Sequence, residues 1–287
     1  MNILNAEKIS KTYGEKVLFD KVVLGVNKGD KIGVIGVNGT GKSTFLKIIA
    51  GIEEPDAGEI VSGRGVTVSY LAQAPQFNPG DTIVGYVIKG KNNASEAEAK
   101  TILTKLGITD FDAAINTLSG GQRKRIALAR TLVSPAEVLI LDEPINGLDP
   151  EGIIEIREIL KNLNAEKGVT IFISSHILSE LSLLANKFAF IENGSIIAQT
   201  DIDQIRNSAG NKTLLKTSDI ERSCKIIRDK FPDARFEIED ENIVFTLGYE
   251  SEIVAVLSTN GIVVNGISNV SVSLEDYYVK LLKEYKK

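Results

Sequence analysis

The chain has 287 residues, of which 43% are hydrophobic and 25% charged, a balance typical of a globular protein with a sizeable core. Its net charge of −5 argues against a general nucleic-acid binder, which needs a basic face to neutralise phosphates. The single cysteine, Cys224, excludes an intrachain disulfide, and we interpret it as a structural residue on a helix. We expect no signal peptide, because the N-terminus "MNILNAEKIS" lacks a basic region followed by an apolar stretch. We expect no membrane span, because no apolar run approaches ~18 residues. Any role at a membrane would therefore depend on a partner.

Residues 1–35 predict short strands and turns, and helices and buried strands are then predicted to alternate up to residue 190. The predicted buried strands are, in chain order, "KIGVIG", "GVTVSYLAQ", "EVLILDEP" and "VTIFISS". The predicted helices are "KSTFLKIIAG", residues 94–134, "EGIIEIREILKNLNAEKG" and "HILSELSLLA". The segment "KFAFIENGSIIAQ" predicts a hairpin at Asn193-Gly194. This alternation predicts the α/β class with a mostly parallel sheet.

The composition changes after "NSAGNK", and the remaining segment predicts a small α+β unit of βαββαβ type with a final helix. We therefore predict two domains, residues 1–212 and residues 213–287.

A glycine-rich loop, "GVNGTGKS", links a predicted strand to a predicted helix. Its glycines allow backbone N–H groups to turn toward a phosphate chain, and the helix N-terminus adds its dipole. In this pattern Lys42 would reach the β- and γ-phosphates, and Ser43 would ligate Mg²⁺. The residues expected to bind the nucleotide here are Gly36, Asn38, Gly39, Thr40, Gly41, Lys42, Ser43 and Thr44.

Two acidic residues, Asp142 and Glu143, end the predicted strand "VLILDEP". Ligands of open α/β sheets bind at the carboxyl ends of the strands. We expect Asp142 to hold the Mg²⁺ shell, and Glu143 to orient and deprotonate an attacking water.

A second anion site is predicted at "LSGGQ", which precedes a helix. One chain cannot easily bring two anion-binding loops onto one phosphate in this topology, so a head-to-tail dimer is the economical solution. Each nucleotide would then lie between the glycine-rich loop of one subunit and "LSGGQ" of the other. The residues predicted for this second loop are Ser119, Gly120, Gly121 and Gln122.

In the order of these motifs, residues 1 to about 200 resemble the ATP-binding-cassette family. The resemblance implies a P-loop NTPase cassette with an antiparallel β subdomain, a parallel-sheet core and a helical subdomain at about residues 74–134. It also implies ATP hydrolysis with Mg²⁺. The expected partners are a second copy or a homologous cassette and transmembrane permease subunits, with no nucleic acid. The expected location is cytoplasmic, at the inner face of the membrane.

The resemblance assigns roles to four further residues. Tyr13 in "KTYG" resembles the aromatic residue that stacks on adenine. Gln73 resembles the glutamine that touches Mg²⁺ and the catalytic water, and Asp149 resembles an aspartate that communicates across the dimer. His176, the only histidine, resembles the residue that contacts the γ-phosphate and positions Glu143; the alternative is an ordinary core histidine.

The two halves of the chain resemble different branches of the family. Residues 1 to about 125 resemble the first cassette of the F-subfamily, the translation-associated ATPases. The remainder resembles the ATP-binding subunit of ABC-2 type exporters of bacitracin or lantibiotics. An exporter subunit is the favoured interpretation. The alternatives are a ribosome-associated ATPase and a chimera of the two branches without a natural partner.

Overall fold

The structure, a computed structural model, describes residues 1–78, 80–90, 94–208, 212–246, 250–270 and 272–285. It divides into two compact units, Met1–Ile202 and Asp203–Lys287. This division lies before the boundary predicted at residue 212, because the composition changes only after helix α7 (Ile202–Asn207). Within "NSAGNK", residues 209–211 lie outside the described residues.

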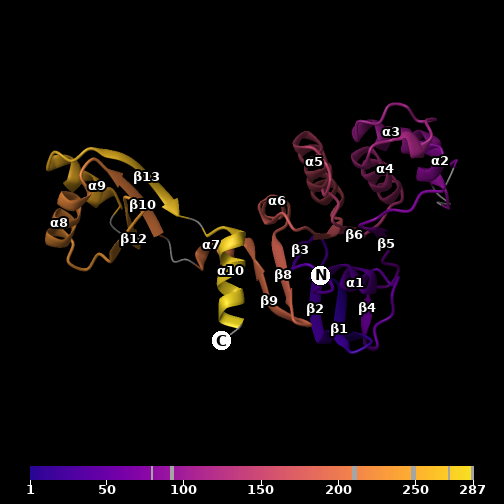
Figure 1. Cartoon of the computed structure of the whole chain (residues 1–287), viewed down its shortest axis with the longest axis horizontal. Helices are drawn as coiled ribbons and strands as arrows, with labels where there is room; N and C mark the ends of the chain where they lie inside the picture. Colours follow the sequence, from indigo (N-terminus) through magenta and orange to yellow (C-terminus); the bar gives the residue numbers. More distant parts are fainter. Residues whose placement is uncertain (79, 91–93, 209–211, 247–249, 271, 286–287) are drawn as a thin grey trace. The chain divides into compact units, whose positions relative to one another are not determined.

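A six-stranded sheet in the order β5-β6-β7-β3-β8-β9 forms the centre of the first unit (Figure 1). Neighbouring strands are parallel from β5 to β8, and β9 pairs antiparallel with β8. The strands are β3 (Lys31–Ile35), β5 (Val68–Leu71), β6 (Val138–Asp142), β7 (Thr170–Ser174), β8 (Lys187–Glu192) and β9 (Ser195–Asp201). Strands β6 and β7 are buried along their whole length. Such burial is typical of parallel strands, because other elements cover both faces of a parallel sheet. The predicted α/β class is confirmed.

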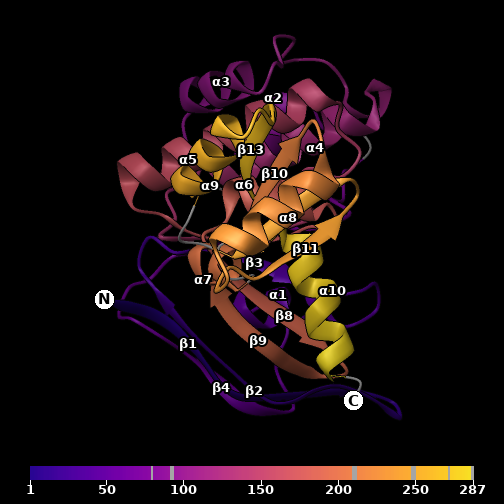
Figure 2. The ribbon, with the colours of Figure 1, turned by 90° about the vertical axis from the view of Figure 1, so that its left-hand side faces the viewer.

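A separate antiparallel sheet has the order β2-β1-β4 (Figure 2). Its strands are β1 (Asn2–Tyr13), β2 (Lys16–Asn27) and β4 (Ala57–Ser62). The prediction of short strands was wrong here, because β1 and β2 each run for 12 residues with several register shifts. Helix α1 (Lys42–Ile49) packs between the two sheets, and its side chains Phe45, Leu46, Ile48 and Ile49 belong to their shared core.

The segment between β5 and β6 is helical. It contains α2 (Ile83–Ile88), α3 (Glu96–Lys105), a short 3₁₀ turn (Ile115–Thr117) and α4 (Gly120–Leu132). The helix predicted over 94–134 is therefore interrupted after α3. The interruption begins at Gly107, whose positive φ of 71° is a left-handed conformation that ends a helix.

The remaining helices of the first unit are α5 (Pro150–Lys167) and α6 (Leu178–Leu184). The predicted hairpin joins β8 and β9, and its turn residues Asn193 and Gly194 have φ of 44° and 80°. Two positive φ values in succession are the signature of a type I′ turn.

The second unit contains the predicted βαββαβ order, in a four-stranded antiparallel sheet arranged β11-β12-β10-β13. Its elements are β10 (Lys212–Thr217), α8 (Ile220–Lys230), β11 (Phe236–Glu239), β12 (Asn242–Thr246), α9 (Glu250–Thr259), β13 (Val264–Val270) and α10 (Leu274–Tyr285). Helices α8 and α9 pack on the sheet, and Cys224 is buried in this core, in agreement with its structural interpretation. Among the described helices, none is long and apolar enough to cross a membrane.

Candidate active site

A cleft of about 710 Å³ opens where the parallel strands of the first unit end. Residues far apart in the sequence meet in its lining: Tyr13, Lys16, Leu18, Asn38, Gly39, Gly41, Lys42, Ser43, Thr44, Gln73, Glu143, Asn146 and His176. Some of them lie at the end of β1, at the start of β2 and in the first turn of α1, and the others follow β3, β5, β6 and β7. Because the parallel strands end at one edge, the sheet topology itself assembles the site.

The glycine-rich loop connects β3 to α1 and is shaped by close backbone contacts. A Cβ at Gly36 would lie 2.6 Å from the carbonyl oxygen of Ile191, so a side chain there would force β8 away. Gly41 has a φ of 98°, and a Cβ on it would lie 2.7 Å from the Phe19 ring. Gly41 also precedes α1 without a side-chain cap. The first N–H groups of α1 therefore remain available to an anion.

Lys42 directs its ammonium group onto this loop. Its Nζ donates to the carbonyl oxygens of Gly36, at 2.8 Å, and Val37, at 3.1 Å. The residue is only 7% exposed, and burial lowers its pKa while Glu143 and Asp142 oppose that shift. The loop thus places a partly desolvated cation beside a helix N-terminus, which is an arrangement for binding phosphate.

Asp142 is held by two hydroxyl groups at the end of β6. Ser174 Oγ donates to Asp142 Oδ1 at 2.7 Å, and the Tyr70 hydroxyl donates to Oδ2 at 3.3 Å. Burial and the charge of Asp142 raise the pKa of Tyr70, so Tyr70 remains a donor. Asp142 is 1% exposed and is therefore fixed in one orientation.

Glu143 has an unusual backbone conformation, with a φ of 50°. Its N–H donates to Ser174 Oγ at 3.0 Å. Its Oε2 accepts from Gln73 Nε2 at 3.0 Å and from Asn146 Nδ2 at 3.1 Å. A non-glycine residue in this region is uncommon, and such strain is concentrated at functional sites. The geometry turns the Glu143 carboxylate into the cleft.

His176 follows β7 and lines the same cleft as Glu143. Its Nδ1 is 3.8 Å from Glu143 Oε2, and its side chain is 47% exposed. The alternative interpretation as a core histidine is therefore wrong. His176 stands where an imidazole can reach both the Glu143 carboxylate and a ligand in the cleft.

Tyr13 lies at the rim of the cleft, where its ring is available for stacking. It is 50% exposed, and the Lys11 ammonium lies 5.5 Å from the ring centroid. The Tyr13 hydroxyl donates to the carboxylate of Glu53, which raises the pKa of Tyr13. The ring is thus anchored at its hydroxyl while remaining partly open to solvent.

The "LSGGQ" residues do not belong to the lining of this cleft. Ser119 caps α4: its Oγ accepts from Gln122 N at 3.2 Å, and Gln122 Oε1 accepts from Ser119 N at 3.0 Å. Asp149 precedes α5, and its Oδ1 accepts from Arg125 Nη2 at 3.4 Å. Within the described part of the chain, Ser119–Gln122 and Asp149 therefore form a surface apart from the glycine-rich loop.

Five residues that support the site were missed from the sequence: Tyr70, Lys124, Arg125, Asn146 and Ser174. Lys124 is 7% exposed, and its Nζ donates to the carbonyl oxygen of Gln73 at 2.8 Å. Ser174 could have been suspected, because it ends the buried strand just before His176. Asn146 donates to Glu143 only three residues earlier, so it also had a local signal. Tyr70, Lys124 and Arg125 act through tertiary hydrogen bonds that no local pattern predicts.

Comparisons with known proteins show the family to which the chain belongs. The family model described as "ABC transporter" matches residues 19–146. The chain is 34% identical to the lantibiotic transport ATP-binding protein SrtF of Streptococcus pyogenes, over 71% of this chain and 93% of SrtF. It is 29% identical to the bacitracin transport ATP-binding protein BcrA of Enterococcus faecalis, over 98% of this chain and 96% of BcrA.

Two further similarities agree. The uncharacterized ABC transporter ATP-binding protein YfmR of Bacillus subtilis is 36% identical over 68% of this chain, which spans only 37% of YfmR. The crystal structure of a nucleotide-free ATP-binding cassette from an ABC transporter is 28% identical, with a TM-score of 0.62, over 70% of this chain and 92% of that cassette. The chain therefore belongs to the family of ABC transporter ATP-binding proteins and is an ATP hydrolase of the cassette type.

Proposed function

We propose that this chain is the ATP-hydrolysing subunit of an exporter and works as a head-to-tail dimer docked to membrane subunits. One observation supports the dimer above all: the cleft contains the glycine-rich loop, Glu143 and His176, whereas Ser119–Gln122 lies on a separate surface. A second copy can supply that surface to the open cleft. Each of the two nucleotides would then bind between two copies.

The residues that contact ATP have separate roles in this proposal. Tyr13 stacks on the adenine, and the loop N–H groups with Lys42 bind the phosphates. Ser119 and Gly121 of the second copy donate hydrogen bonds to the γ-phosphate, and Asp149 lies beside them. Fixed donors stabilise the charge that spreads over the transferring phosphoryl group.

Glu143 orients and deprotonates the attacking water in the proposed reaction. Gln73 and Asn146 hold the Glu143 carboxylate at one oxygen, and His176 lies beside it. His176 can donate to the γ-phosphate through one ring nitrogen while the other faces Glu143. These contacts limit the orientations available to the base before substrate binds.

Two candidate oxygen donors for Mg²⁺, Ser43 and Gln73, line the cleft, and a third, Asp142, is buried at the end of β6. The described residues include no group of three or more His, Cys, Asp or Glu that could hold a metal by themselves. Mg²⁺ is commonly bound through one or two protein oxygens, waters and substrate phosphates. We propose that Ser43, Gln73 and Asp142 hold it through hydroxyl, amide and carboxylate oxygens. When bound, Mg²⁺ neutralises charge on the β- and γ-phosphate oxygens.

A groove of about 370 Å³ between the helical segment and the sheet supports docking to a membrane subunit. It is lined by Ile52 after α1, by Tyr70 and neighbouring residues of β5, and by Tyr86 and Arg130 from α2 and α4. The Arg130 guanidinium lies 4.7 Å from the Tyr86 ring centroid, so the groove has an aromatic and cationic wall. Aromatic residues and arginine are the types that contribute most at protein interfaces.

The exporter assignment rests on the names of the relatives that align from end to end. BcrA aligns over 98% of this chain, which includes both halves and the second unit. That extent favours a single exporter-type subunit over a chimera. We propose a cytoplasmic location at the membrane on the same ground.

The dimer can be tested by mixing two inactive variants. Lys42→Ala damages the phosphate loop, and Ser119→Arg blocks the second loop. A mixed dimer contains one site in which both loops are intact, so random mixing should restore roughly a quarter of the parental ATPase rate. A mixture that stays inactive, although the two proteins form mixed dimers by pull-down, would contradict the head-to-tail arrangement.

The base can be tested with Glu143→Gln, with Glu59→Gln on the exposed strand β4 as the matched control. The variant should keep ATP affinity, lose turnover by ~10²–10⁴-fold and form a long-lived dimer by gel filtration with ATP. Hydrolysis at the parental rate would show that Glu143 is not the base.

A further inference from the structure

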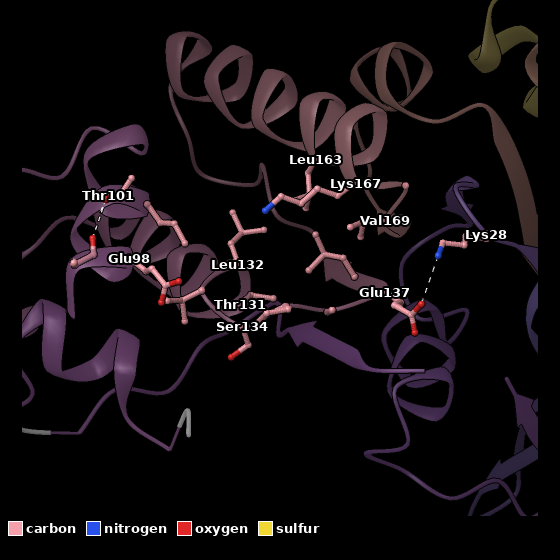
Figure 3. Close-up of a pocket in the computed structure, with 17 residues that line it drawn as sticks. Lys28, Glu98, Thr101, Thr131, Leu132, Ser134, Glu137, Leu163, Lys167 and Val169 are labelled. Atoms are coloured by element: carbon pink, nitrogen blue, oxygen red, sulfur yellow. Dashed lines mark hydrogen bonds and ion pairs between the residues drawn. The ribbon is translucent and has the colours of Figure 1, made fainter. Parts of the chain in front are cut away.

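Helices α4 and α5 are separated by a cavity near their C-terminal ends (Figure 3). The cavity has a volume of about 540 Å³, and Leu132 of α4 faces it opposite Leu163 of α5. An ion pair at its edge joins Lys28 to Glu137, at 3.6 Å, and neither residue belongs to α4 or α5. This space would hold several waters, so side-chain packing between the two helices is loose at this end.

Arg125 connects the same two helices, from the middle of α4 to the second turn of α5. Its Nη1 donates to Glu155 Oε2 on α5 at 2.8 Å and to the carbonyl oxygen of Leu106 at 3.1 Å. Its Nη2 lies 3.4 Å from Asp149 Oδ1, and its side chain is only 15% exposed. One guanidinium therefore joins α4 to the end of α3, to the first turns of α5 and to the Asp149 loop.

Two glycines make room for this guanidinium. A Cβ on Gly107 would lie 2.7 Å from Arg125 Nη1, and a Cβ on Gly152 would lie 2.5 Å from Nη2. The Gly152 Cβ would also lie 2.8 Å from Asp149 Oδ1. Any side chain at these positions would displace the arginine from its partners. The space between the two glycines therefore fits a planar guanidinium group with a carboxylate on each of two sides. The ammonium group of a lysine cannot reproduce this geometry.

We propose that Arg125 is a positioning residue that fixes Asp149 relative to Ser119–Gln122, so that both face the second copy as one rigid surface. Ser119 caps α4, which contains Arg125, and Asp149 precedes α5, which contains Glu155. Because the cavity separates the other ends of these helices, the guanidinium provides the charged link between them. The proposal rests on the head-to-tail dimer proposed above.

The test is Arg125→Lys, which keeps the positive charge but removes the planar guanidinium group with its several N–H donors. The matched control is Arg157→Lys on α5, because Arg157 is also 15% exposed and pairs with Glu180 at 2.9 Å. Arg125 does not line the cleft, so the affinity of ATP for the isolated copy should change by less than about twofold. Turnover at saturating ATP should fall about tenfold, and Arg157→Lys should show no comparable fall.

Dimer formation gives a second readout, in the Glu143→Gln background. Adding Arg125→Lys should weaken the ATP-dependent dimer about tenfold in sedimentation equilibrium, whereas adding Arg157→Lys should not. Gly152→Ala keeps the arginine but places a methyl group in the space that its guanidinium occupies. This variant should also weaken the ATP-dependent dimer.

The outcomes separate the two proposals. If Glu143→Gln alone forms no dimer with ATP, the proposed function fails before Arg125 is tested. If that dimer forms and Arg125→Lys leaves both its stability and the turnover unchanged, the dimer stands and the positioning role is refuted. A lower melting temperature with unchanged dimer affinity would also refute it, because the role would then be only structural.

Discussion

Ser174 offers a sharp test of how the acidic residues are held. Its hydroxyl donates to Asp142 Oδ1 at 2.7 Å and accepts from Glu143 N at 3.0 Å, and the residue is fully buried. Ser174→Ala removes both partners at once. It leaves a buried carboxylate with only its longer bond to Tyr70 and leaves the Glu143 N–H without this acceptor.

The size of the effect follows from these two contacts. A hydrogen bond to a charged group contributes ~1.5–3 kcal/mol, and an unsatisfied buried donor costs ~1–3 kcal/mol. The Glu143 backbone, with its φ of 50°, also loses the bond that holds it in the left-handed region. Two contacts that share one hydroxyl do not add in full, and a single substitution rarely costs more than ~4–5 kcal/mol. We therefore expect the free energy of unfolding to fall by about 2–4 kcal/mol, and ATP turnover to fall about tenfold or more.

The assay is urea denaturation followed by circular dichroism, together with steady-state ATP hydrolysis. The control is Ser175→Ala, because Ser175 is also buried but bonds only to the backbone of Ile177: its Oγ accepts from Ile177 N at 3.0 Å and donates to Ile177 O at 3.4 Å. Losing these neutral, local bonds should cost about 1 kcal/mol. Equal losses of stability and turnover in the two variants would refute the reasoning.

Four further predictions concern single residues. Lys42→Ala should weaken ATP binding more than tenfold by fluorescent-nucleotide titration, because a charge-assisted contact to phosphate is worth ~1.5–3 kcal/mol, and undiminished affinity would contradict its phosphate role. His176→Ala should reduce kcat more than it weakens ATP affinity, and an unchanged kcat would remove it from the reaction. Tyr70→Phe loses the donor to Asp142 and should change the Mg²⁺ concentration for half-maximal turnover several-fold; an unchanged Mg²⁺ titration would show that this bond is dispensable. Burial raises the pKa of the Cys224 thiol, so its thiolate fraction at pH 8 is reduced, and the native chain should react with a disulfide reagent much more slowly than the urea-unfolded chain.

Much of the fold could be predicted because local patterns agree with it. The buried strands β6 and β7 are continuous apolar runs, the I′ turn is marked by Asn193-Gly194, and the glycine-rich loop has its strand before and helix after. Strand β4 had no such signal: five of its six residues are exposed, and it is a strand because it pairs with β1. The interpretation of residues 94–134 as helical also missed the break at Gly107, where the backbone takes a left-handed conformation.

In the candidate site, the residues that belong to motifs could be predicted, whereas the residues that hold them in place could not. The residues named from motifs that line the cleft include Lys42, Gln73, Glu143 and His176, which the sheet topology brings together from four segments. The contacts that hold them, such as Ser174 to Asp142 and Lys124 to the Gln73 carbonyl, depend on distances between elements. A serine or lysine has many equivalent uses in a sequence, and only packing selects one.

At the N-terminus of α4, Ser119 and Gln122 cap each other, and this determines which of their polar groups can still bind a ligand. Because Ser119 Oγ already accepts the Gln122 N–H, its hydroxyl proton is the polar group left to point outward, whereas the Gln122 side-chain oxygen is occupied by Ser119 N. The serine is thus prepared to donate, and the glutamine serves to keep it so. Replacing Ser119 by aspartate would preserve the cap but present a carboxylate to an incoming triphosphate, which distinguishes a residue needed for its helix from one needed for its ligand.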